Sequence, residues 1–153
     1  MAIAVAAALA GCGSSLDFSC TMNVSVNGGA PAAANCFAAG ATTSGMNAVS
    51  IAMNGALPNV SAAQFAMTLP SAPSVGTYGA ANVTTAAAQL QTASGAIYSQ
   101  SNPGSVGTFS VVLTSVSSAN ANGGTAYFLH GSATVTLVGQ SGAPGTATIT
   151  ATF

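Results

Sequence analysis

Apolar and polar residues alternate with a period of two along most of this chain. In the segment 18–26, Phe18, Cys20, Met22, Val24 and Val26 are separated by hydroxyl-bearing and amide side chains. Alternation of this kind predicts β-strands with one face buried and the other in solvent. The same period marks the segments 49–53, 65–69, 109–113, 127–137 and 146–153.

Clusters of turn-forming residues separate these segments. Asn27-Gly28-Gly29 is a strong hairpin signal, because Asn and Gly readily adopt the positive φ angles that tight hairpin turns need. Further clusters occupy 42–45, 70–76, 100–104, 117–124 and 139–145. The sequence therefore predicts an all-β fold, a single antiparallel β-sandwich or partly open barrel of about eight to ten strands.

One segment, 80–91, has mixed local preferences. Ala86-Ala87-Ala88 favours helix, whereas Val83-Thr84-Thr85 disfavours it because β-branched side chains lose rotamer freedom in a helix. We expect a strand or an irregular crossover here.

Charged side chains are almost absent. The 153 residues include no Lys or Arg, one acid (Asp17) and one histidine (His130), whereas about a quarter of residues in ordinary soluble domains are charged. Nucleic-acid binding depends on Lys and Arg that neutralise phosphates, and metal sites need several His, Cys, Asp or Glu ligands. We expect no nucleic-acid partner, no metal and no cofactor.

The first residues have the pattern of a targeting segment. Residues 1–10 form an unbroken apolar run, which is shorter than the ~20 residues that span a bilayer as a helix. Leu9-Ala10-Gly11-Cys12 follows it and resembles the lipobox of bacterial lipoproteins, in which the cysteine is lipidated and becomes the first mature residue. The resemblance implies a signal segment 1–11, a lipidated tether 12–16 anchored through Cys12, and an antiparallel β domain 17–153. The alternative is that the run belongs to the fold and Cys12 is a buried thiol.

Two cysteines remain if Cys12 carries lipid. An even number suits a disulfide in an oxidising compartment. A hairpin folded about Gly28 brings Cys20 opposite Cys36, because the two lie at the same sequence distance from that turn. We therefore predict a cross-strand Cys20–Cys36 disulfide, worth about 3 kcal/mol in the chain-entropy model. The alternative is a pair of reduced core thiols.

The last third of the chain extends the resemblance. The segments 107–116, 130–137 and 145–153 look like the closing strands of small bacterial lipoproteins of unknown function, in which a His-Gly or Ser-Gly step precedes a terminal strand ending in Phe. The turn Val26–Gly28 is similar to their opening hairpin. This resemblance covers most of the mature chain through motifs of low specificity. It implies a fold and an envelope location, and it brings no catalytic residues.

Two features could indicate a more specialised role. Serine-based catalysis would have to combine His130, Asp17 and one of many serines, but no GxSxG motif occurs and Asp17 follows closely after Cys12. We expect His130 to be an ordinary exposed strand residue. The threonine rows in 146–152 and 132–136 could form a flat ice- or glycan-binding face, but threonine is common in strands, and we expect ordinary solvent-facing positions.

The sequence thus favours a non-catalytic lipoprotein, a structural or binding module held at the bacterial outer membrane and facing the periplasm or the cell surface. Its protein or glycan partner stays open. One alternative is a self-assembling fibre subunit that associates through strand edges, because the charges that normally guard edges are missing. A second is a small outer-membrane β-barrel that ends at Phe153. Against the barrel, we predict that the ring of Phe153 packs into a globular core.

Overall fold

The computed structural model describes residues 19–102, 107–121 and 123–153, and these residues form ten β-strands and no helix. Every pairing between the strands is antiparallel. The strands are β1 Thr21–Val26, β2 Ala32–Thr43, β3 Met46–Met53, β4 Val60–Leu69, β5 Gly76–Tyr78, β6 Thr85–Thr92, β7 Ile97–Asn102, β8 Thr108–Ala121, β9 Gly124–Gly139 and β10 Thr146–Thr152. The predicted all-β fold is confirmed.

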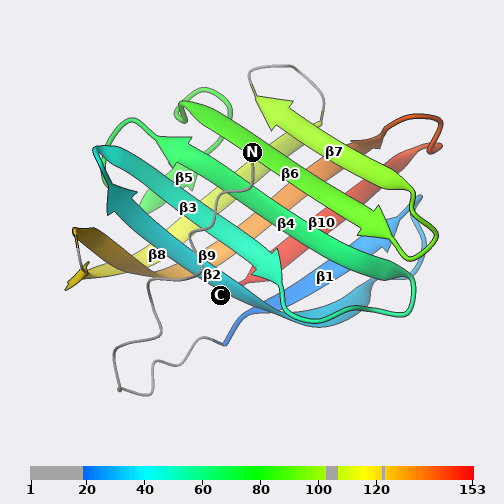
Figure 1. Ribbon diagram of the computed structural model, residues 1–153, viewed down its shortest axis with the longest axis horizontal. Helices are drawn as coiled ribbons and strands as arrows, with labels where there is room; N and C mark the ends of the chain where they lie inside the picture. The colour runs from blue at the N-terminus through cyan, green and yellow to red at the C-terminus, as the bar shows by residue number, and fades with distance from the viewer. Residues whose placement is uncertain (1–18, 103–106, 122) are drawn as a thin grey trace.

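The strands form two layers that cross each other (Figure 1). The front layer holds β2, β3, β4, β6 and β7, and the back layer holds β1, β10, β9, β8 and β5. The layers are joined into a ring of eight strands, in the order β1-β2-β3-β4-β6-β7-β9-β10. β9 closes this ring, because its end pairs with β7 on one side and with β10 on the other, and its beginning makes an additional pairing with β2. β8 and β5 branch from β9 outside the ring.

The first hairpin forms where the turn signal predicts it. Asn27 and Gly28 both have positive φ angles, 54° and 69°, as the favoured two-residue hairpin turns require. β1 and β2 then pair in a regular register that runs from Val24 opposite Ala32 to Thr21 opposite Asn35. The backbone N–H of Gly29 donates to the carbonyl of Val26, a turn that would set Val24 opposite Pro31; since Val24 pairs with Ala32, one extra residue lies between Gly29 and Ala32.

The core lies between the two layers and is made by the inward positions of the alternating segments. The largest fully buried side chains are Phe65, Met22, Ile51, Met67, Leu90, Leu113, Leu137, Ile149, Val49, Val111 and Val135. Phe65 and Phe109 pack with their ring centroids 5.3 Å apart. Phe153 belongs to the same cluster, so its predicted burial is confirmed. Its backbone exchanges two hydrogen bonds with Gly131.

Some sequence expectations need correction. The segment 117–124, expected as a turn, is almost entirely strand, because β8 runs to Ala121 and β9 starts at Gly124. The cluster 100–104 likewise begins inside β7, and the cluster 70–76 ends on the first residue of β5. Small and hydroxyl-bearing residues favour turns locally, but they extend a strand readily when a partner strand is present. The ambiguous segment 80–91 becomes a strand, β6, from Thr85 onward.

Candidate functional site

The outward face of the back layer is covered by hydroxyl and amide side chains. We call it the hydroxyl face. It consists of three rows across β1, β10, β9 and β8: Ser25-Thr148-Thr136-Thr108, Asn23-Thr150-Thr134-Ser110 and Thr21-Thr152-Ser132-Val112. All of these side chains are exposed or half-buried, and all except Val112 carry a hydroxyl or an amide.

Strand geometry sets the spacing of this array. Neighbours in a row are about 5 Å apart across strands, and successive rows are about 7 Å apart along a strand. Each hydroxyl can both donate and accept a hydrogen bond, and each threonine adds a methyl group beside it. Because none of these side chains is charged, the face can recognise a partner only by neutral hydrogen bonds and apolar contact.

His130 lies at one end of the hydroxyl face. It is the outward residue of β9 that precedes Ser132, and its side chain is exposed. Its backbone carbonyl accepts a hydrogen bond from Oγ1 of Thr114 at 3.2 Å. Asp17, the acid that a catalytic arrangement would need, lies outside the described residues. Within the described ranges, no three His, Cys, Asp or Glu residues cluster in a way that could hold a metal ion.

The predicted disulfide is present. Cys20 and Cys36 are bonded, with their Cα atoms 4.8 Å apart, and the backbone N–H of Cys36 donates to the carbonyl of Cys20 at 2.9 Å. Both residues are buried. The bond lies where β2 leaves its pairing with β1 and begins to pair with β3, so it fastens the bend through which β2 passes between the layers. Cys12, the predicted lipidation site, lies outside the described residues.

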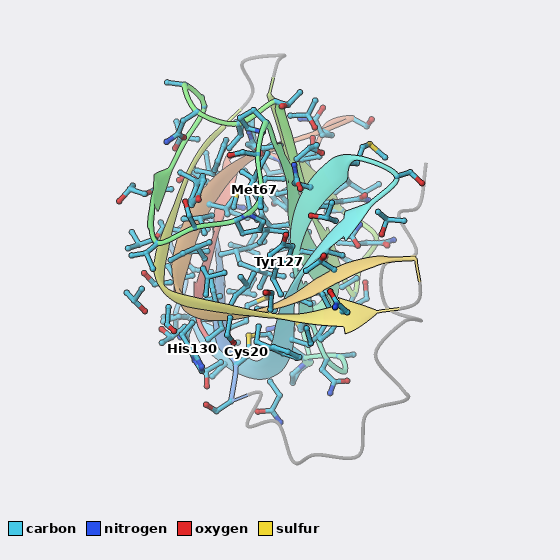
Figure 2. All side chains as sticks on the ribbon, turned by 90° about the vertical axis from the view of Figure 1, so that its left-hand side faces the viewer. Cys20, Met67, Tyr127 and His130 are labelled. Carbon is cyan, nitrogen blue, oxygen red and sulfur yellow. A yellow bond between two sulfur atoms is a disulfide. The ribbon has the colours of Figure 1, made fainter. Side chains whose placement is uncertain are left out.

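A small polar cluster joins three strands at one end of the ring. The hydroxyl of Thr42 donates to Oδ1 of Asn47 at 2.6 Å and lies 3.1 Å from the hydroxyl of Tyr127. Asn47 is buried, and Tyr127 is half-buried between the front layer and β9 (Figure 2). Since all three groups are partnered, the cluster holds the beginning of β9 against β2 and β3.

The sequence identified the members of the hydroxyl face only in part. Alternation placed the threonines of β9 and β10 on outward positions, but it does not tell which strands are neighbours. The pairing of β1 with β10, and of β8 with β9, adds two further strands to what looked like separate threonine rows. The Thr42-Asn47-Tyr127 cluster gave no local signal, because Thr42 and Tyr127 are far apart in the chain.

Comparison with models of protein families, with curated proteins and with solved structures finds no match for this chain. In the part of the chain that the structure describes, there is no helix long and apolar enough to cross a membrane.

Proposed function

We propose that this chain is a non-catalytic lipoprotein of the bacterial envelope, tethered to the outer membrane through Cys12, whose β domain acts as a binding or structural module. The observation that carries the proposal is the Cys20–Cys36 disulfide. Stable disulfides are typical of exported proteins and rare in the reducing cytosol. A disulfide-bonded domain that follows a lipobox-like segment fits an exported and anchored protein.

Changing Cys12 tests the anchor. In bacteria that process lipoproteins, the unaltered chain should incorporate labelled fatty acid and partition into detergent. Cys12→Ala should abolish the incorporation and leave an uncleaved or soluble protein. Cys20→Ala combined with Cys36→Ala is the matched control, because it removes two cysteines and should keep the lipid. Equal labelling of Cys12→Ala and the unaltered chain would contradict the anchor.

We further propose that the binding surface is the hydroxyl face and that its partner is a neutral glycan. A charged partner would lose hydration on this face without meeting an opposite charge, whereas a neutral polyol can exchange its hydrogen bonds with water for bonds to the threonine hydroxyls. The methyl groups beside those hydroxyls can pack against the C–H groups of a sugar ring.

A printed array that holds neutral glycans beside anionic ones tests this surface. We expect binding to neutral glycans that is lost in Thr134→Val combined with Thr150→Val, a cross-strand pair at the centre of the face. Thr68→Val combined with Thr85→Val is the control, because this pair has the same chemistry on the front layer. Retention of binding in the first variant, or binding to anionic glycans only, would contradict the proposal.

The distribution of polarity supports a globular domain over the alternative of a membrane barrel. Membrane barrels place apolar residues outward toward lipid and polar residues toward the lumen. Here the inward positions of β1, β9 and β10 are apolar and buried, for example Met22, Val135 and Ile149, and the outward positions are the hydroxyl face. Such an outward surface suits water better than lipid.

A further inference from the structure

One stretch of strand edge has no partner strand. Ser115–Ala121 of β8 pairs on one side with β9, Thr114 lies at the bulge just before this run, and β5 covers only Val111–Leu113 on the other side. Among the described residues, none of the backbone hydrogen bonds outside the regular strand pairs involves Thr114–Ala121. We call the uncovered side of Thr114–Ala121 the β8 edge. It is the longest strand edge without a partner strand among the described residues.

The β8 edge belongs to a hairpin that reaches beyond the other strands, at the left of Figure 1. Along the edge, only Val116 is half-buried, and the other described side chains from Thr114 to Asn120 are exposed on both faces of the strand. Val75, which precedes β5, is 64% exposed. Since Gly76 pairs with Leu113, Val75 stands where the open edge begins, and an apolar side chain therefore borders it.

The β8 edge also lacks protection by charge or by proline. Natural edge strands are blunted by Lys or other charged side chains, by Pro, or by being very short. Thr114–Ala121 contains no charged residue and no Pro. A β-bulge marks its beginning, between Leu113 and Ser115, and from Ser115 to Ala121 the pairing with β9 is regular. The backbone donors and acceptors that face outward from this run have no partner strand in the described part of the chain, and they can continue the sheet.

We propose that the β8 edge pairs antiparallel with the β8 edge of a second copy of this chain, about a two-fold axis. Under such an axis the same run of backbone supplies matching donors and acceptors to both sides. Two copies meet without repulsion, because the whole chain contains no Lys or Arg and a single acid. A partner with charged side chains along its strand would find no opposite charge here.

The product is a closed dimer. An interface about a two-fold axis uses the same surface of both copies and therefore ends after two, whereas a filament needs two different open surfaces on each copy. The ring of eight strands leaves no second edge of comparable length among the described residues. This inference concerns the β8 edge alone and does not depend on the lipid anchor or on glycan binding.

Sedimentation velocity of the full-length chain carrying Cys12→Ser, with its disulfide formed, tests the dimer over a range of concentrations. We expect a monomer–dimer equilibrium without larger species. Ser117→Lys combined with Ala119→Lys should raise the dimer dissociation constant by about a hundredfold or more, because like charges facing each other across an interface strongly oppose association. Gln89→Lys combined with Gln91→Lys is the matched control. It adds the same charge on exposed positions of β6, which has partners on both sides, and it should leave the dimer intact.

Three outcomes would overturn the proposal. A parent chain that stays monomeric at every concentration has no such interface. A dimer weakened equally by both lysine pairs associates through another surface or is sensitive only to net charge. Filaments in the parent chain would contradict the closed dimer and would favour the fibre subunit. Circular dichroism shows whether the double lysine variant of β8 is folded. A second variant, Ser117→Glu, should also weaken the dimer, and it tests the pairing if the lysine variant unfolds.

Discussion

The ring and the projecting part of the β8–β9 hairpin are built from similar residues but are stabilised differently. In the ring, strands have partners on both sides and their inward residues form one core. In the projecting part of β8, the strand has one partner, and most side chains from Thr114 to Asn120 are exposed on both faces. The composition is rich in Ala, Ser and Thr in both regions, so burial and pairing, rather than residue type, separate the stable framework from the surface that is free to associate.

The largest expected effect lies in the ring. Phe65 is 1% exposed and packs against Phe109. Phe65→Ala should lower the free energy of unfolding by about 3 to 5 kcal/mol, because it removes buried apolar area and leaves a cavity. Urea denaturation followed by circular dichroism measures this. A loss below about 1 kcal/mol would show that the ring core is not the main source of stability.

The disulfide should rank next. Replacing Cys20 and Cys36 together by Ala should lower the free energy of unfolding by about 3 kcal/mol, since the closed loop of the unfolded chain is released. The double variant should have the same denaturation midpoint as the unaltered chain whose disulfide has been reduced. Equal midpoints for the oxidised and reduced chain would contradict a stabilising role for this bond.

Gly131 lies close to the junction between the ring and the projecting hairpin. A Cβ atom there would collide with the carbonyl oxygen of Val112, which is backbone and cannot move aside easily. Gly131→Ala should therefore cost about 1 to 3 kcal/mol through overpacking. Gly79→Ala is the matched control, because its Cβ would meet only an ordinary contact, 3.7 Å from the carbonyl of Phe109. Similar stability of the two variants would mean that the junction adapts freely.

The smallest effect belongs to the projecting part of β8. Ser117→Ala should change the free energy of unfolding by less than about 0.5 kcal/mol, because exposed substitutions away from caps, cavities and networks rarely do more. Denaturation at a concentration where the chain is monomeric is the appropriate measurement. A larger loss would place this part of β8 within the stable framework and would remove the contrast with the ring.

The sequence predicted most of the strands but not how they are arranged. Alternation identified the inward positions of β1, β3, β4, β8 and β10, and the symmetric placement of Cys20 and Cys36 about Gly28 gave the disulfide. These are local properties. The closure of the ring is not local, because it depends on β9 pairing with β7 and on β10 pairing with β1.

The hydroxyl face and the β8 edge could likewise be predicted only in the parts that depend on local sequence. The threonines of β10 and β9 were visible as rows, but the pairing that joins them to β1 and β8 was not. Most of the β8 edge was hidden, because Ser117–Ala121 was expected to be part of a turn. Its small hydroxyl-bearing residues favour turns locally, and only the pairing with Gly124–Phe128 makes them a strand.

Amide hydrogen exchange, read residue by residue by NMR at a low and a high protein concentration, tests most directly the claim that a closed ring carries one open edge. In Thr114–Ala121, the amides that face away from β9 should exchange rapidly at low concentration and become protected at high concentration. Amides of β4 and β6, which have partners on both sides, should be protected equally at both. Concentration-independent exchange along β8, or protection that grows in the ring strands instead, would contradict the account.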